Sequence, residues 1–462
     1  MLIETSAYIK GDTVGGMKAG QSFVHKGVME LSVVGNLFDI GAGETIDNQG
    51  EIYIQHGQNV PIIKLTDATA TLQNTGVIEI DGGLASGLVN PGTVLLTNGQ
   101  LNNQGTLRIS STEDPAIRVD AGSLINDDTL DVAAAQSLQL IYLNGGQLTN
   151  NGFFRISGAG EDNASLLLAK SATTVHNNGT IEIIDAFNSG LQLQGLFTTT
   201  ANSEFLFTNN IRNTGNLLSH TGSSPVVYNG SMKAENSINC VTFSGAAENN
   251  GFLDLSTCSI SMAGGTNNSG GHIISKDLAY IGQNYGVVEF LSTNAFSLIG
   301  TDVITNNGVM VDHGDAFRNI KFHDGEALGF PVWNKGLFVS LFYGTLSDGI
   351  KEVVNLNYTE TGSLPISDNW YTDRAQTTVA GTWHQSDHHY TPNAAAVGAD
   401  SIFFEVNMTG SNPIVLSVPV ILPTSCPLPE IVRIFQPVVD RNLADHTVWR
   451  GNRAQTIAIK FN

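Results

Sequence analysis

The densest group of side chains that could do chemistry lies near the C-terminus, in the segment "WHQSDHHY". It holds four groups that bind metal ions, namely His384, Asp387, His388 and His389. His384 and His388 are four residues apart, and on a helix this spacing places two imidazoles on one face, as in zinc sites. The flanking Gly-Thr-Trp and Thr-Pro favour a loop or a strand, where the two histidines also share a face. The context therefore favours loop hydrogen bonding or a subunit contact, with metal binding as the lesser alternative.

Two further segments carry the acids and bases that a polysaccharide lyase or hydrolase needs, with Arg or Lys to hold anionic sugars. They contain Glu113, Asp114, Arg118 and Asp120 in "STEDPAIRVD", and Asp312, His313, Asp315, Arg318, Lys321, His323 and Asp324 in "MVDHGDAFRNIKFHDGE". No pair of carboxylates recurs at equivalent positions on neighbouring repeats. The sequence therefore favours solvated loops at both places, no catalytic residue and no enzyme activity.

The charge balance limits the partners of the chain. Lys and Arg number 21 against 42 Asp and Glu, which gives a net charge of −21. Nucleic acids and anionic membranes attract basic patches, so neither is an expected partner. We expect no cofactor, although the many carboxylates leave calcium as an option. No apolar run reaches the ~18 residues needed to span a bilayer, so no membrane span is expected.

Three cysteines occur, at Cys240, Cys258 and Cys426, with no zinc-binding spacing. A disulfide between Cys240 and Cys258 is conceivable in an oxidising compartment. The odd count and the wide spacing favour buried free thiols instead.

A repeated Asn-x-Gly motif indicates the elements that must position these groups. Its asparagines are Asn48, Asn74, Asn103, Asn150, Asn177, Asn213, Asn249, Asn268, Asn306 and Asn334, and Asn126 with Asp128 forms a degenerate copy. After each Gly, apolar residues stand mostly at the second and fourth places, as Ile78 and Ile80 do after Gly76. Alternation with period two predicts a strand with one buried face. Asn and Gly are expected to form the preceding turn because both tolerate positive φ.

One such coil cannot be stable alone. Burying five apolar side chains stabilises by roughly 8 to 15 kcal/mol, whereas ordering some 25 residues costs more, at about 1 to 2 kcal/mol each. Each strand must therefore pair with its copy in the next coil, ~4.8 Å away. Copies that run in one direction are parallel, and the crossover rule makes the winding right-handed.

The sequence thus predicts an all-β protein, a right-handed parallel β-helix (solenoid). We expect an N-terminal cap or degenerate coils over residues 1–44 and the β-helix over 45–344. A C-terminal β-rich, sandwich-like domain or cap follows over 345–462. Within it, "ADSIFFEVNMTGSNPIVLSVPVILP" reads as two strands joined by a Thr-Gly-Ser-Asn-Pro turn, which predicts a hairpin.

The outward position of each predicted strand tests the stacking. It holds Tyr53, Glu79, Arg108, Asp131, Arg155 and Glu182, so that the sign of the charge alternates from Glu79 onward. Stacked neighbours would form acid–base pairs that fix the register, and the asparagines are expected to stack their amides in the same way. Further along, the same position holds Ile273, Val311 and Val339, which we expect to be covered by the C-terminal region or by a partner subunit.

The coil segments "TIDNQGEIYI", "TLQNTGVIEI", "QLNNQGTLRI", "QLTNNGFFRI" and "TVHNNGTIEI" resemble those of large bacterial surface proteins of the filamentous-haemagglutinin or adhesin type. "GADSIFFEV" is similar to C-terminal modules of such secreted chains. The resemblance covers residues 45 to 340 and implies secretion and attachment to cells or surfaces. Similar coils also occur in polysaccharide-cleaving enzymes and phage tailspikes. In contrast to that family, no secretion signal, sorting module or sugar-binding motif is visible.

These observations favour an extracellular, cell-surface structural and adhesive protein, a stiff appendage that attaches through multivalent contacts. The expected partners are copies of itself or other parts of a larger surface assembly, with a cell-surface or polysaccharide ligand. A β-helix polysaccharide lyase or hydrolase and a trimeric viral fibre or tailspike remain as alternatives.

Overall fold

The computed structural model describes residues 2–3, 8–13, 22–33, 36–56, 61–82, 92–110, 115–133, 139–158, 165–211, 215–223, 226–244, 247–276, 278–291, 304–312, 332–334, 337–341, 350–355, 367–384, 389–396, 399, 401–406, 414–419 and 432–433. The chain forms two compact units, Met1–Ala263 and Gly264–Asn462. Strands dominate both, and the helical element of the described residues is a short 3-10 helix, η2 (Ala394–Ala396). Within these residues, no helix has the length and apolar character required to cross a bilayer.

Each full coil of the first unit contains three strands, shown by β8 (Ile63–Leu65), β9 (Thr71–Asn74) and β10 (Val77–Asp81). Burial alternates along all three, so one face of every strand points inward. Two residues connect β9 to β10, whereas the connection from Asp81 to the next coil at Val94 is long.

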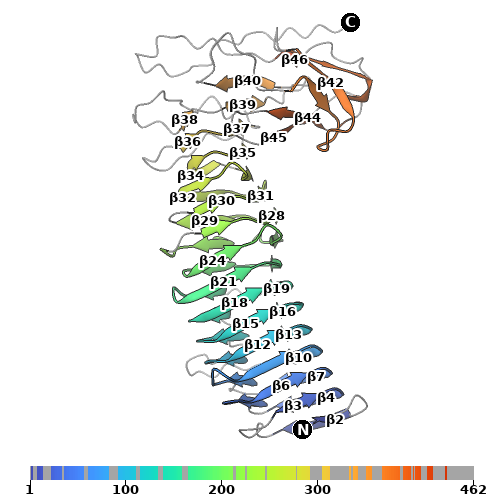
Figure 1. Ribbon diagram of the computed structural model, residues 1–462, viewed down its shortest axis with the longest axis vertical. Coiled ribbons are helices and arrows are strands. Elements are labelled where there is room, and N and C mark those ends of the chain that lie inside the picture. Colours follow the sequence, from blue (N-terminus) through green and yellow to red (C-terminus); the bar gives the residue numbers. More distant parts are fainter. Residues whose placement is uncertain are drawn as a thin grey trace. The chain divides into compact units, whose positions relative to one another are not determined.

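Equivalent strands of consecutive coils pair in parallel and build three columns, which Figure 1 shows as a stack of short ribs. Column one comprises β5 (Phe38–Ile40), β8, β11 (Val94–Leu96), β14 (Ile117–Val119), β17 (Gln139–Leu143), β20 (Ser165–Ala169), β23 (Leu191–Leu193), β26 (Leu218–His220) and β29 (Val241–Ser244). Column two comprises β1 (Leu2–Ile3), β3 (Phe23–His25), β6 (Thr45–Asn48), β9, β12 (Gln100–Asn103), β15 (Ser123–Asn126), β18 (Gly146–Asn150), β21 (Thr173–Asn177), β24 (Leu196–Thr199), β27 (Val226–Tyr228) and β30 (Ala247–Asn249).

Column three comprises β2 (Tyr8–Thr13), β4 (Val28–Val33), β7 (Glu51–His56), β10, β13 (Thr106–Ser110), β16 (Thr129–Ala133), β19 (Phe153–Ser157), β22 (Thr180–Ile184), β25 (Glu204–Thr208), β28 (Ser231–Glu235) and β31 (Phe252–Leu255). β2 pairs with β4 and β4 with β7, all in parallel. The described strands before residue 45 are therefore early coils of the same stack.

A continuous apolar core runs up the inside of column three. Ile78, Leu107, Leu130, Phe154 and Ile181 pair in register from coil to coil, and each side chain is fully buried. At about 1.5 to 3 kcal/mol for each buried side chain, this interior is a main source of stability. The predicted parallel β-helix is thus confirmed.

The second unit contains further parallel strands. β34 (Leu278–Asn284), β36 (Ile304–Asn306) and β38 (Val332–Asn334) pair in one series, and β33 (His272–Ser275), β35 (Val287–Phe290), β37 (Val309–Asp312) and β39 (Leu337–Leu341) in another. The division between the two units falls within β32 (Ile260–Asn267). β40 (Ile350–Asn355) pairs antiparallel to β39, which changes the parallel pattern there.

A six-stranded sheet follows in the second unit, in the order β45-β44-β41-β42-β43-β46. Its strands are β41 (Asn369–Tyr371), β42 (Val379–His384), β43 (His389–Pro392), β44 (Ser401–Val406), β45 (Ile414–Pro419) and β46 (Val432–Arg433). β44 and β45 form the antiparallel pair that the Thr-Gly-Ser-Asn-Pro segment predicted. Trp370 stacks on Trp383 and on Phe404, with ring centroids 5.6 and 4.5 Å away.

Candidate functional site

A line of buried amides runs along the corner between columns two and three of the first unit. Asn48 Nδ2 donates to Asn74 Oδ1 at 2.7 Å, and the same bond recurs from Asn74 to Asn103 at 2.7 Å. It continues at 2.8 Å through Asn103, Asn126, Asn150 and Asn177, all fully buried. Asn48 Nδ2 also donates to the Val77 carbonyl of the next coil, at 3.1 Å. We call these six residues the amide ladder; it ties each coil to the next.

Other side chains take the ladder position beyond these asparagines. His25 is in register with Asn48, and its Nε2 lies 3.1 Å from the Glu51 carbonyl oxygen. Because a carbonyl only accepts, Nε2 carries the proton in this bond. After Asn177 the position passes to Thr199, Tyr228 and Asn249. The Asn-x-Gly motif does not indicate His25, Thr199 or Tyr228, because none of them is Asn, although the strand alternation continues through all three.

The glycines of the motif serve a different purpose from the one expected. Gly50, Gly76 and Gly105 do not have positive φ. A Cβ added to Gly76 would lie 2.0 Å from the Gly50 carbonyl oxygen, and one on Gly105 would lie 2.2 Å from that of Gly76. The close approach of successive coils therefore selects Gly at these corners.

Two copies of the Asn-x-Gly motif do not occupy the expected position before a strand of column three or its equivalent. Asn213 lies outside the described residues, and the segment after Gly215 leads into β26 of column one, while Glu204–Thr208 supplies column three in that coil. In the second unit it is Asn267, and not Asn268, that donates to Asn284, at 2.8 Å. Asn284 donates to Asn306 at 2.7 Å, and Asn306 is in register with Asn334.

This shift of one residue reverses the expected orientation of Ile273. A four-residue turn follows Asn267, so Ile273 pairs in register with Val288 and is fully buried on the inward side of β33. Its assignment to the outward column was wrong. Val311 is in register with Glu289 and Val339, and both Val309 and Val311 are fully buried. The side chain of Val339 lies outside the described residues, and a covering partner remains a prediction.

The outward residues of column three form the expected acid–base series. Tyr53, Glu79, Arg108, Asp131, Arg155 and Glu182 are in register along β7 to β22. Arg108 forms an ion pair with Glu79, and Arg155 binds Asp131 through Nε, at 3.0 Å, and through Nη2. The hydrogen bond to Asp131 raises the pKa of Arg155. The charged side chains of this face therefore mostly form ion pairs with side chains of the neighbouring coil.

Column two presents a face of contrasting chemistry. The outward residues of β9, β12, β15, β18 and β21 are Thr71, Gln73, Gln100, Asn102, Ser123, Ile125, Gln147, Thr149, Thr174 and His176, and none is Lys, Arg or a carboxylate. The adjoining corner adds Gln104, Asp127, Asn151 and Asn178. We call this set the amide face.

Hydrogen bonds between coils order the amide face. Gln73 Nε2 donates to Gln104 Oε1 at 2.8 Å, and Asn151 Nδ2 donates to Asp127 Oδ1 at 2.7 Å. Asn178 Nδ2 donates to Asn151 Oδ1, also at 2.7 Å. Amides and hydroxyls at regular spacing can donate and accept toward a neutral polar ligand. The sequence alone did not indicate this face, since only the coil register identifies which residues share it.

The predicted histidine cluster is only partly described. His384 and His389 lie opposite each other on β42 and β43, while Asp387 and His388 fall outside the described residues. Among the residues that the structure describes, no group of three or more His, Cys, Asp or Glu side chains is arranged to hold a metal ion.

The acidic segments are also partly described. Asp312 lies on β37 in register with Phe290, and the rest of its cluster falls outside the described residues, as do Glu113 and Asp114. Arg118 pairs with Asp120 at 3.0 Å, and its guanidinium lies 5.6 Å from the centre of the Tyr142 ring.

One acid–base pair was not foreseen. His272 Nε2 lies 2.6 Å from Glu289 Oε1, and the Glu289 side chain is nearly buried. The residues belong to neighbouring coils of the second unit, and the irregular turn after Asn267 concealed their relation in the sequence.

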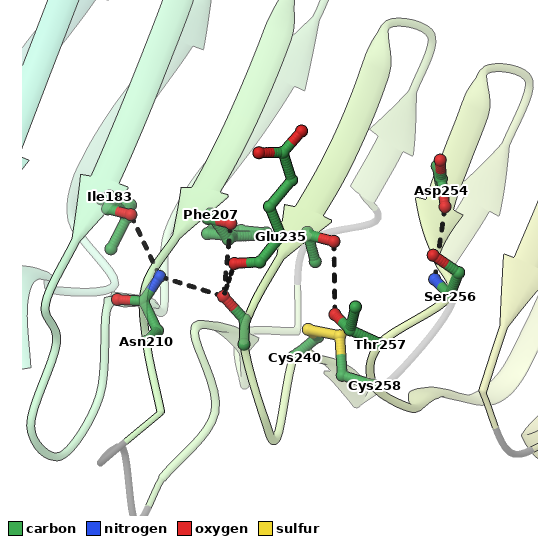
Figure 2. Close-up of a disulfide and its surroundings, with 11 residues drawn as sticks. Ile183, Phe207, Asn210, Glu235, Cys240, Asp254, Ser256, Thr257 and Cys258 are labelled. Atoms are coloured by element: carbon green, nitrogen blue, oxygen red, sulfur yellow. Dashed lines mark hydrogen bonds between the residues drawn. A yellow bond between two sulfur atoms is a disulfide. The ribbon is translucent and has the colours of Figure 1, made fainter.

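Cys240 and Cys258 form a disulfide, which corrects the expectation of free thiols (Figure 2). The two cysteines are 18 residues apart, about one coil; Cys240 directly precedes β29, and Cys258 lies two residues before the start of β32. Both residues are buried. Figure 2 also shows Asn210, whose Nδ2 donates to the Ile183 carbonyl at 3.1 Å. The disulfide thus joins consecutive coils beside a buried polar corner.

Comparisons of the chain with models of protein families, with curated proteins and with solved structures found no match. The resemblance to bacterial surface proteins therefore depends on the repeat residues alone.

Proposed function

We propose that this protein is an extracellular structural and adhesive molecule that attaches to other cells or surfaces. The observation that carries the proposal is the amide face, a regular array of hydrogen-bonding side chains, uncharged on the strands and with Asp127 as the carboxylate of its corner, on a stack held in register. Strand spacing repeats the array about every 4.8 Å. A partner with its own repeating polar groups can therefore make many weak contacts at once, and together these give useful avidity.

Charge supports a neutral partner. The chain carries a net charge of −21, and the amide face contains no Lys or Arg. Anionic surfaces are repelled by such a molecule. A neutral polysaccharide or the neutral glycans of a cell surface fit the face better.

The disulfide supports the extracellular location. Disulfides form and persist in oxidising compartments and are rare in the cytosol. The Cys240–Cys258 bond is consistent with a protein that works outside the cell.

The test compares adhesion of matched variants. Beads that carry the purified chain are placed in flow over cells and over a neutral polysaccharide. One variant combines Gln100→Ala, Ser123→Ala and Gln147→Ala on the amide face. The control combines Thr106→Ala, Thr129→Ala and Ser157→Ala on column three of the same coils. We expect adhesion to fall severalfold in the first variant and to be unchanged in the second.

Three results would contradict the proposal. If the parent chain does not adhere, or if both variants adhere as it does, the amide face is not adhesive. If the chain releases reducing sugars from the polysaccharide, the enzyme alternative takes its place.

A further inference from the structure

The chain contains seven Asn–Gly pairs, beginning at Asn98, Asn144, Asn151, Asn178, Asn229, Asn250 and Asn307. In such a pair the backbone nitrogen of Gly can attack the side-chain amide carbon of Asn, because Gly has no side chain to hinder the approach. The structure shows that six of these pairs are restrained by hydrogen bonds to other residues. In the pair Asn98–Gly99, Asn98 N donates to the Leu65 carbonyl at 3.3 Å and the Gly99 carbonyl accepts from Ser123 N at 2.9 Å, but the described residues show no hydrogen bond from another coil to the two groups that react, the Asn98 side chain and Gly99 N.

Asn151 and Asn178 illustrate the restrained pairs. Asn151 Oδ1 accepts from Asn178 Nδ2, and Asn151 Nδ2 donates to Asp127, both at 2.7 Å. Gly152 N donates to the Asn126 carbonyl at 3.1 Å, and Gly179 N donates to the Asn150 carbonyl at 3.0 Å. Bond formation between Gly152 N and the Asn151 side chain would therefore break three hydrogen bonds between coils.

The other four restrained pairs have at least one such bond each. Asn144 Nδ2 donates to Asp120 at 3.3 Å, and Asn229 Nδ2 donates to the Thr199 carbonyl at 2.8 Å. Asn250 Nδ2 donates to Asn229 Oδ1 at 2.9 Å, and Gly308 N donates to the Asn284 carbonyl at 2.9 Å.

Asn98 and Gly99 lie in the turn between β11 and β12, where the Asn98 side chain is half-buried. Gly99 N donates to Asn98 Oδ1 at 2.9 Å. Within the described part of the chain, the Asn98 side chain and Gly99 N make no other hydrogen bond. The attacking nitrogen is therefore already against the amide group that it would attack, an arrangement close to the reactive one. Within the described residues, no hydrogen bond between the reacting atoms and another coil needs to break.

We propose that Asn98 is a site of spontaneous deamidation. Gly99 N gives its proton to solvent and bonds to Asn98 Cγ, while the bond from Cγ to Nδ2 breaks and the nitrogen leaves as ammonia. Water then opens the resulting five-membered imide at either carbonyl, which yields Asp or iso-Asp. One water is consumed and one ammonia is released, so no oxidant or reductant takes part.

The modification adds one negative charge to a chain whose net charge is already −21. It proceeds in one direction, so the charged fraction at residue 98 records the age of the molecule. This inference is independent of the proposed adhesive role.

The experiment follows all seven sites in one sample. The folded full-length protein is incubated at neutral pH, and peptide mass spectrometry measures deamidation at each site over time. We expect Asn98 to react at least about tenfold faster than Asn151 and Asn178, because each hydrogen bond that must break raises the barrier. The same chain, reduced and unfolded in urea, should lose this ranking.

Two variants test the cause of the difference. Asn98→Gln should abolish the fast phase. Asn178→Ala removes the donor to Asn151 Oδ1 and should accelerate Asn151 alone, while circular dichroism verifies that the fold is kept. If Asn98 reacts no faster than Asn151 in the folded chain, or if the unfolded chain shows the same ranking, the proposal is overturned.

Discussion

Asn103 Nδ2 donates to Asn126 Oδ1 at 2.8 Å, across the gap between one coil and the next, in a site with no solvent exposure. The same nitrogen donates to the Thr129 carbonyl at 2.7 Å. A single amide thus satisfies both a side chain and a backbone group of the following coil. Although these asparagines are polar, they contribute to the stability of the stack as buried residues that bond one coil to the next.

Replacing Asn103 by Leu should therefore destabilise the first unit strongly. The substitution leaves the Thr129 carbonyl and the neighbouring amides without a partner, and each unsatisfied buried group costs about 1 to 3 kcal/mol. Urea unfolding would measure the loss. Asn102→Leu, on the outward side of the same strand, is the control and should change the midpoint little. An equal loss in both variants would contradict the role of the ladder.

Gly105→Ala should also destabilise the stack, by about 1 to 3 kcal/mol for an overpacked site. The new Cβ would lie 2.2 Å from the Gly76 carbonyl oxygen. Gly43→Ala provides the comparison, because Gly43 has a φ of 69° and no atom within 4 Å of an added Cβ. If crowding between coils is the cause, thermal unfolding will show the larger loss for Gly105→Ala.

Arg155→Glu should weaken the first unit modestly. It places three carboxylates in series with Asp131 and Glu182, and directly opposed like charges on neighbouring strands cost roughly 0.2 to 1 kcal/mol. Added salt should reduce the loss, since the Arg155 side chain is partly exposed to solvent. Combining Arg155→Glu with Glu182→Arg removes one of the two opposed like-charge pairs and should restore part of the stability. A loss that does not respond to salt would point to packing of the Arg155 stem instead.

Reduction of the Cys240–Cys258 disulfide should lower the free energy of unfolding of the first unit by about 2 to 4 kcal/mol. The bond closes a loop of one coil. Cys240→Ser should match the reduced parent, whereas Cys426→Ser should leave the unit unchanged. Unfolding with and without a reducing agent measures the difference, and equal midpoints would show that the bond contributes nothing.

Stability should fall at alkaline pH because of Tyr228. Burial raises its pKa well above the ordinary value of 10.0, with a smaller contribution from Glu204. A folded-state pKa above the unfolded one means that the stabilisation is complete below pH 10 and is lost as pH rises toward the folded value. The ultraviolet absorbance of tyrosinate should report late ionisation in the folded chain. Tyr228→Phe should flatten the alkaline decline in unfolding experiments.

The sequence predicted the parallel coils and the register of β7 to β22, because a two-residue turn after each ladder Asn keeps the period-two pattern in phase. The prediction failed where the turn changed length. Four residues follow Asn267, so the assigned phase was wrong and Ile273 was placed outward. Four residues also follow Thr199, and without an Asn that coil was not recognised.

The disulfide and the amide face were not predictable for a related reason. Cys240 and Cys258 become neighbours only once the local coil length is known. Gln73 and Gln104 are far apart in sequence and meet only through the register of three strands. To predict which side chains of different coils meet, one must know the number of residues in every turn between them. The sequence indicates that number only where the turns have the same length.

The amide ladder also has a polarity. From Asn48 to Asn150 each Nδ2 donates to the Asn of the coil that follows it in the chain, so from Asn74 to Asn177 each Oδ1 receives from the coil before. A newly completed coil therefore ends with an N–H group that awaits an acceptor, and the next segment to emerge supplies one. If the stack grows from the N-terminus, each finished coil offers a free N–H group to the Asn of the next coil. If it grows from the C-terminus, each finished coil offers an Oδ1 acceptor that has no donor yet.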